Sequence, residues 1–186
     1  MRTLVLGLGN PILTDDGVGV RVAESVQARL QQAAAPGAEA PGAIGMAYHL
    51  QRLDYADDAG DSMVIDVQEM SVGGLTLMET MIGYERVILI DAMEHPDLPP
   101  GAMCRLSLDD LRAISPTQHS ASPHDATLVT AFDLGRRMGY ALPNEMIIYA
   151  IGVANVLDFS DQPTPAVAAA IPQVVAAVLE ELRRES

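Results

Sequence analysis

Two carboxylates and one imidazole occupy positions in this sequence where chemistry is expected. Asp16 follows the first apolar segment, Asp91 directly follows the apolar residues 87–90, and His124 precedes an amphipathic segment. Carboxylate oxygens and an imidazole nitrogen together suit a borderline divalent ion such as nickel or zinc, with positions left for water or substrate. The same groups could instead serve general acid–base catalysis, with one carboxylate orienting the histidine.

Each of the three residues also has a plainer, structural interpretation. Asp16 and its neighbour Asp15 could complement the dipole of the helix that follows them. Asp91 could cap a turn, and His124 could be an exposed surface histidine. Spacing alone favours the structural interpretation for each residue, so only a shared position at one edge of a sheet groups them as a site.

Other titratable residues compete for a place in this site. His119 is a rival of His124, because both lie in the same polar part of the chain. Asp66 and Glu69 are predicted to end a strand and to add carboxylates to the same edge. The remaining candidates are interpreted as surface or helix-start residues: His49, His95, Asp109, Asp110 and Asp125.

Strands that alternate with helices must position these side chains. Short apolar runs predict strands at 4–8, 63–67, 87–90, 103–108 and 146–153. Helical spacing predicts helices from 18 to 30, from 75 to 82, from 128 onward, and from Thr164-Pro165 onward, with Pro172 kinking the last helix or marking its start. Loops are expected at 33–42, 55–61 and 115–122.

This order of elements predicts one α/β domain over residues 1–186, with a largely parallel sheet. Ligands bind such sheets beyond the carboxyl ends of the strands. Asp16, Asp91 and His124 are therefore expected to converge at that edge.

Composition narrows the possible partners and compartments. The chain has 186 residues, 49% of them apolar, and a formal net charge of −14 with no lysine, which disfavours nucleic acid and anionic membranes. Cys104 is the only cysteine, so no internal disulfide forms and a reducing compartment is natural. The first apolar run is too short for a signal peptide and no stretch approaches a membrane span, so we expect a cytoplasmic protein.

Several common motifs are excluded. The opening Gly7-Leu8-Gly9-Asn10-Pro11-Ile12 lacks the third glycine of a dinucleotide-binding turn, since Ile12 stands in its place. A phosphate-binding loop that ends in Gly-Lys-Ser/Thr is impossible without lysine. The sequence also contains no Gly-x-Ser-x-Gly nucleophile motif.

Three segments, in order, resemble the signatures of the hydrogenase maturation proteases. Residues 4–19 carry the strand, Gly-x-Gly-Asn turn and acidic pair of that family, with Asp15-Asp16-Gly17 leading into a helix. Residues 87–92, with Asp91, look like the second signature, and Ser122-Pro123-His124 matches the third. The resemblance spans nearly the whole chain.

The resemblance implies a three-layer fold with a central twisted sheet and helices on both faces. It implies that Asp16, Asp91 and His124 bind metal, namely nickel already placed in the substrate or another divalent ion at the same site. The implied substrate and partner is the large-subunit precursor of a [NiFe] hydrogenase, from which an endopeptidase of this family removes a C-terminal extension.

The sequence departs from the family pattern at two places. The family has an Asp-Gly-Gly-Thr-type turn after its second strand, whereas here Gly73-Gly74 lies further on and is followed by Leu75. The segment 33–61 is also longer than expected. The altered glycine turn keeps a second hypothesis open, a metal-dependent assembly factor that holds the precursor without cutting it.

A third hypothesis comes from the opening motif, which also resembles the bacterial peptidyl-tRNA hydrolases. Such an enzyme needs a basic face and a histidine soon after the motif. Here Val20 stands at that position and the nearest histidine is His49, so this alternative ranks last.

Overall fold

The structure is a computed structural model that describes residues 1–33, 51–56, 62–114 and 123–184. Within these ranges the side chains of residues 51–56, 62 and 123–127 are not described. The expected loop at 33–42, except residue 33, and the expected loop at 115–122 lie outside the described residues, as do His49 and His119.

Six strands form one sheet in the order β2-β3-β1-β4-β6-β5. The four central strands are parallel, whereas the two edge strands run antiparallel to their neighbours. The strands are β1 (Arg2–Leu8), β2 (Gln51–Ala56), β3 (Ser62–Met70), β4 (Arg86–Met93), β5 (Met103–Ser107) and β6 (Glu145–Gly152). The mostly parallel sheet predicted from the apolar runs is confirmed.

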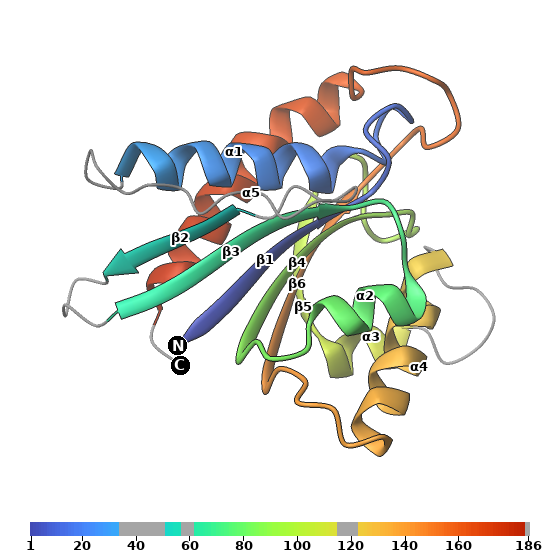
Figure 1. The fold of residues 1–186 in the computed structure, drawn as a ribbon. Coiled ribbons are helices and arrows are strands. Elements are labelled where there is room, and N and C mark those ends of the chain that lie inside the picture. Colours follow the sequence, from blue (N-terminus) through green and yellow to red (C-terminus); the bar gives the residue numbers. More distant parts are fainter. Residues whose placement is uncertain (34–50, 57–61, 115–122, 185–186) are drawn as a thin grey trace.

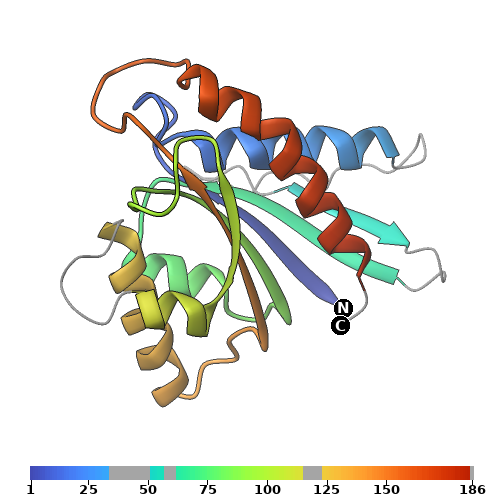
Figure 2. The ribbon, with the colours of Figure 1, turned by 180° about the vertical axis from the view of Figure 1, so that it is seen from behind.

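Helices cover both faces of the sheet. Helices α1 (Val18–Ala33) and α5 (Pro165–Arg183) lie on one face, while α2 (Gly74–Thr80), α3 (Leu108–Ile114) and α4 (Pro123–Arg137) lie on the other (Figures 1 and 2). The result is the expected three-layer α/β fold.

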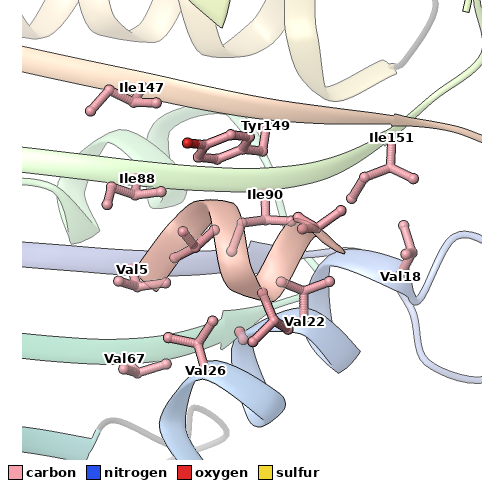
Figure 3. Close-up of a cluster of buried hydrophobic side chains, with 14 of the residues drawn as sticks. Val5, Val18, Val22, Val26, Val67, Ile88, Ile90, Ile147, Tyr149 and Ile151 are labelled. Atoms are coloured by element: carbon pink, nitrogen blue, oxygen red, sulfur yellow. The ribbon is translucent and has the colours of Figure 1, made fainter. Parts of the chain in front are cut away.

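Alternation along the strands divides the core into two layers. Val5, Ile88 and Ile147 lie in the buried cluster beneath α1 and α5 (Figure 3). Their neighbours in sequence, Leu4 and Val87, belong to the cluster on the opposite face. Successive side chains along a strand point to opposite faces of the sheet. The same alternation therefore decides on which face a candidate site residue such as Asp91 lies.

The order of the strands creates a switch point beside β1. From β1 the chain passes through α1 and β2 to β3 on one side of β1, whereas from β4 it passes to β5 and then through α3 and α4 to β6 on the other side. The connections therefore diverge at the carboxyl ends of β1 and β4. Open α/β sheets bind their ligands at such points.

Several details differ from the sequence-based expectations. Strand β2 was not predicted, and Tyr55 and Ala56 belong to it rather than to a loop. The seven-residue helix α3 was also missed, although Asp109 and Asp110 do lie in its first turn, as expected. Pro172 lies inside α5, which begins at Pro165, so Pro172 does not mark a helix start.

Asp66 was wrongly predicted to end its strand. Strand β3 continues to Met70, and Asp66 is fully buried within it. Its Oδ2 accepts hydrogen bonds from Arg2 Nη2 at 2.9 Å and from the Tyr84 hydroxyl at 2.8 Å. Asp66 is thus part of a structural ion pair rather than of the predicted site.

Helix α5 corrects the expectation that no stretch approaches a membrane span. Among the described helices it alone is long and apolar enough, by length and composition, to cross a membrane. In the fold, however, Val174 and Val178 are fully buried in the cluster that α5 shares with α1 and the sheet. The apolar face of α5 is therefore occupied by packing.

Candidate functional site

Helix α1 begins directly above the switch point. A Cβ atom placed on Gly19 would lie 2.3 Å from the carbonyl oxygen of Leu8 and 2.4 Å from that of Ile90. Only a residue without a side chain permits this approach. The start of α1 is thereby held against the carboxyl ends of both β1 and β4, where Asp16 and Asp91 were expected to meet.

Asp16 lies in the loop between β1 and α1. Its side chain is partly exposed, and its Oδ2 accepts a hydrogen bond of 2.6 Å from the main-chain N–H of Asn10. Among the described residues this is the only hydrogen bond to the Asp16 carboxylate. The loop therefore fixes one carboxylate oxygen and leaves the other available to a ligand.

The turn around Asp16 requires glycine. Gly9 has a φ of +125°, and a Cβ there would lie 1.8 Å from the main-chain oxygen of Asp16. The N–H of Gly9 donates to Met70 O at 3.0 Å, and the Ser71 hydroxyl donates to Gly9 O at 3.0 Å. These contacts join the loop of Asp16 to the carboxyl end of β3.

Asp91 lies within the last three residues of β4 rather than directly after the strand. Its side chain is 5% exposed, and its Oδ1 accepts a hydrogen bond of 2.9 Å from the N–H of Ala92. Strand alternation places Asp91 on the same face as Val87 and Leu89, which is the face covered by α2, α3 and α4. A buried carboxylate at a switch point, on the face covered by α4, can coordinate a metal or hold a proton.

His124 lies in the first turn of α4, because this helix begins at Pro123. The sequence-based expectation that His124 precedes the helix is therefore wrong by one turn. Helix α4 begins on the side of the molecule where β3 ends and α2 starts (Figure 1). The side chain of His124 is not described, and among the described side chains no three histidine, cysteine or acidic residues form a metal-binding group.

Asp15 has a role that the sequence did not reveal. It is fully buried, and its Oδ2 accepts hydrogen bonds from the N–H groups of Ala154 and Asn155 at 3.0 and 3.1 Å. The N–H of Thr164 donates to Asp15 Oδ1 at 2.6 Å, and the Thr164 hydroxyl donates to Oδ2 at 3.0 Å. The carboxylate therefore fastens the loop of Asp16 to the loop between β6 and α5.

Two expectations about the starts of helices α1 and α5 are corrected. Helix α1 has no acidic residue in its first turn, so neither Asp15 nor Asp16 is a first-turn partner of its dipole. Thr164 precedes the first residue of α5, as predicted, but its side chain makes no capping hydrogen bond to that helix.

Arg21 strengthens the same junction. Its Nη2 donates to the main-chain oxygens of Pro11 and Asp161, one from each loop. Thr14 adds a hydrogen bond of 2.6 Å from its hydroxyl to Asp158 O, and it adopts a φ of 45° to do so. The loops that follow β1 and β6 therefore form one fixed unit beside Asp16.

The shifted glycines Gly73-Gly74 form the start of α2. Gly73 is the N-cap residue with an extended φ of −117°, whereas Gly74 has a φ of +65°. A Cβ on Gly74 would meet nothing within 4 Å. The positive φ, rather than crowding, therefore accounts for glycine at position 74.

A second cluster of ionisable residues lies between the last turns of α5 and strands β4, β5 and β6. Glu181 of α5 is 3% exposed and pairs with Arg86 at 3.0 Å and with Arg105 at 2.9 Å. The Tyr149 hydroxyl donates to Glu181 Oε2 at 3.0 Å. The hydrogen bond from Arg105 is the largest of the effects that lower the pKa of Glu181, whereas burial and the neighbouring Glu181 raise the pKa of Tyr149 to about 12.

These contacts fasten the last turns of α5 to β4, β5 and β6. Cys104 lies nearby in β5, as expected, and it is partly buried. Burial, with a smaller contribution from Asp110, raises the pKa of its thiol. That environment suits a packing role rather than a reactive thiolate.

The fold and the site define a class of protein: a three-layer α/β domain with two carboxylates at the switch point between its central parallel strands. A profile of the hydrogenase maturation protease family matches residues 50–181. The chain therefore belongs to the family of hydrogenase maturation proteases, and it is a peptidase. The profile does not include the glycine turn and Asp16, which were the first signature noted in the sequence.

Individual relatives agree with this assignment. The chain is 26% identical over 183 residues to the hydrogenase 2 maturation protease of Escherichia coli (strain K12), covering 98% of this chain and 92% of the relative. It is also similar to the solved structure of the hydrogenase maturating endopeptidase HybD from E. coli, with a TM-score of 0.69 at 26% identity over 98% and 93% of the two chains.

A more distant structure supports the fold alone. The [NiFe] hydrogenase maturation protease HybD from Thermococcus kodakarensis superposes with a TM-score of 0.60 at 19% identity, over 99% of this chain and all of the other. Because the chain belongs to the protease family, the resemblance of its opening motif to peptidyl-tRNA hydrolases does not assign it to that class.

Proposed function

We propose that this protein removes the C-terminal extension of a [NiFe]-hydrogenase large-subunit precursor that already contains nickel. The observation that carries the proposal is the contact of Gly19 with both Leu8 and Ile90, which brings the segments of Asp16 and Asp91 to one switch point. A peptidase of this family then has two carboxylates where an α/β sheet binds its ligand.

In this proposal the nickel belongs to the substrate, and Asp16, Asp91 and His124 complete its coordination. Two carboxylates and an imidazole fit a borderline divalent ion. The arrangement of Asp16 supports this role, because one of its oxygens is held by Asn10 N–H and the other accepts no hydrogen bond from the described residues. Bound metal would polarise the scissile carbonyl and lower the pKa of a water molecule to about 7, as zinc does in hydrolases.

The protein's own contribution is mainly positioning. Gly9 and Asn10 hold the Asp16 loop, whereas Ala92 N–H fixes Asp91 at the end of β4. Groups held in this way lose little freedom when the substrate arrives, which favours the reaction through proximity and orientation. The proposed place of action is the cytoplasm, in keeping with a chain that has a single cysteine.

The test is a mass-resolved incubation with the nickel-loaded large-subunit precursor from the same host. The unmodified protein should release a single C-terminal fragment. Asp16→Asn, Asp91→Asn and His124→Gln should each slow release at least about 100-fold, the loss typical when one group that stabilises a transition state is removed. Asp97→Asn is the matched control, because its side chain is 94% exposed and it should leave the rate unchanged.

Two outcomes would contradict the proposal. Processing by Asp91→Asn at the normal rate would remove Asp91 from the mechanism. A stable complex with an intact precursor, with nickel confirmed in the precursor, would instead identify an assembly factor that holds the subunit without cutting it.

A further inference from the structure

The loop between β6 and α5 displays two large apolar side chains to solvent. Leu157 is 82% exposed and Phe159 is 81% exposed, the highest values among the large apolar residues in the described part of the chain. Ile12, in the neighbouring loop after β1, is 54% exposed. We call Ile12, Leu157 and Phe159 the apolar rim patch.

The exposure of Phe159 is unusual for this composition. The chain has two phenylalanines and no tryptophan, and the other phenylalanine, Phe132, is only 1% exposed. Scattered exposed apolar residues are normal in soluble proteins, whereas exposed apolar residues grouped on adjoining segments are candidates for an interaction site.

Hydrogen bonds fix the backbone that carries the patch. Asn155 Oδ1 accepts from the N–H groups of Leu157 and Asp158, and Asn155 Nδ2 donates to Asp158 Oδ2 at 2.8 Å. The N–H of Ser160 donates to Ile12 O at 3.0 Å, and Ser160 O accepts from Thr14 N–H at 3.0 Å. The side chains are therefore displayed on two segments already joined to each other, so binding orders little additional backbone.

The surroundings of the patch are acidic. Asp158 and Asp161 are exposed on the same loop, and the whole chain carries a net charge of −14. Arg21, the cation at this junction, uses its guanidinium to bind main-chain oxygens of both loops. A partner for this surface should present apolar side chains flanked by lysine or arginine.

The patch is continuous with the candidate site. Ile12 and Asp16 share one loop, and Asp15 and Arg21 tie that loop to the segment of Leu157 and Phe159. A protein seated on the patch would therefore be held beside the Asp16 carboxylate.

We infer that the apolar rim patch is the docking surface for the folded body of the protein substrate, through an apolar area of that substrate bordered by basic residues. The inference rests on the proposed function, which identifies this substrate as the large-subunit precursor. Docking on the patch requires no metal, so it should also occur with precursor that contains no nickel. The patch would hold the body of the substrate while its C-terminal segment reaches the carboxylates.

The test measures binding of nickel-free precursor by biolayer interferometry. Leu157→Ser and Phe159→Ser should each raise the dissociation constant at least about tenfold, as expected when an apolar anchor of an interface is removed. Asp161→Asn should slow association two- to threefold and reduce its salt dependence. Met138→Ser is the control, since Met138 is 58% exposed but lies just after α4, near the amino-terminal end of β6, and should not change binding.

The outcomes separate this inference from the proposed function. Equal binding by all variants, or no binding of nickel-free precursor by the unmodified protein, would overturn the docking surface even if the nickel-loaded precursor is cut. Binding that depends on Leu157 and Phe159 without cleavage of loaded precursor would support the docking surface and contradict the proposed function.

Two further readouts complete the test. Unfolding curves of the variants should coincide with that of the unmodified protein, because these side chains are exposed. Light scattering should give the same mass for the unmodified protein and for a Leu157→Ser/Phe159→Ser variant. A dimer that only the variant loses would assign the patch to a second copy of this chain and overturn the inference.

Discussion

Gly19 of α1 and Ile90 of β4 are in such close contact that a Cβ on Gly19 would lie 2.4 Å from the Ile90 carbonyl oxygen. The contact joins the first turn of a helix to the strand that carries Asp91. It sets how closely the Asp16 loop approaches that strand, and the main chain on both sides leaves no room for adjustment.

Gly19→Ala should therefore destabilise the protein by about 2 kcal/mol, as overpacking of a tight interior does. Helix propensity alone predicts the opposite sign, since alanine in a helix is favoured over glycine by about 1 kcal/mol. Urea unfolding measures the difference, with Glu24→Ala on the exposed face of α1 as the control. A variant as stable as the unmodified protein would show that α1 can move away from the switch point.

Asp15 and Asp16 should respond differently to the same substitution. Asp15→Asn replaces an acceptor oxygen with an amide that faces donors from Ala154, Asn155 and Thr164, so we expect a loss of about 3 kcal/mol. Asp16→Asn should cost less than about 1 kcal/mol, because Asp16 is partly exposed and accepts a single hydrogen bond from the described residues. Denaturant unfolding of the two variants checks the contrast, and equal losses would contradict the structural role of Asp15.

Glu181 should make stability depend on acid pH. Its pKa is lowered first by the hydrogen bond from Arg105, with support from Tyr149 and Arg86, so the folded state holds the charged form more strongly than the unfolded state does. The stabilisation from Glu181 is present above the ordinary glutamate pKa of about 4.3. It is lost as the pH falls through the lower pKa that Glu181 has in the folded protein.

Glu181→Gln should cost about 2 kcal/mol at pH 7, because it removes the buried one of the two carboxylates that pair with Arg86 and leaves only Glu145, which is 39% exposed. Unfolding curves measured between pH 7 and pH 3 should show this difference shrinking at the acid end. Glu180→Gln is the matched control, since Glu180 is 66% exposed and pairs only on the surface with Arg184. A constant difference at all pH values would contradict the linkage.

Tyr149 should make stability depend on alkaline pH. Burial, followed by the hydrogen bond to Glu181, raises the pKa of Tyr149 to about 12. The unfolded chain ionises its tyrosines near pH 10, so the contribution of Tyr149 is complete below that pH and is lost as the pH rises towards 12. Tyr149→Phe should remove this part of the loss of stability at alkaline pH. Measurements of the free energy of unfolding from pH 9 to pH 12 would detect the difference.

The sequence predicted the centre of the fold well because apolar runs mark buried parallel strands. Residues 4–8 and 87–90 lie in β1 and β4 as predicted, and Asp91 lies near the carboxyl end of β4. Strand β2 has no such run, since it reads Gln51-Arg52-Leu53-Asp54-Tyr55-Ala56 and forms by pairing with β3 at the edge of the sheet. Helix α3 begins at Leu108, which the predicted strand 103–108 included, and it follows β5 without a loop to mark its start.

Roles that depend on distant partners could not be predicted. Asp15 and Asp16 are neighbours of the same type, and contacts with residues 154–164 alone distinguish the structural carboxylate from the candidate ligand. Asp66 follows aliphatic residues as Asp91 does, but Arg2 and Tyr84 bind it within the sheet. No local pattern separates these cases. The metal-binding role of Asp16, Asp91 and His124 stays a prediction for the cleavage assay.

The bond between Asp15 and Thr164 also has a consequence for biosynthesis, because the two residues are 149 positions apart. A chain made from its N-terminus on the ribosome exposes Asp15 early, whereas the N–H groups that hold its carboxylate emerge only about 140 to 150 residues later. The Asp16 loop therefore stays without its anchor until residues 154–164 have been made. The loop can reach its folded position only after that segment has been translated.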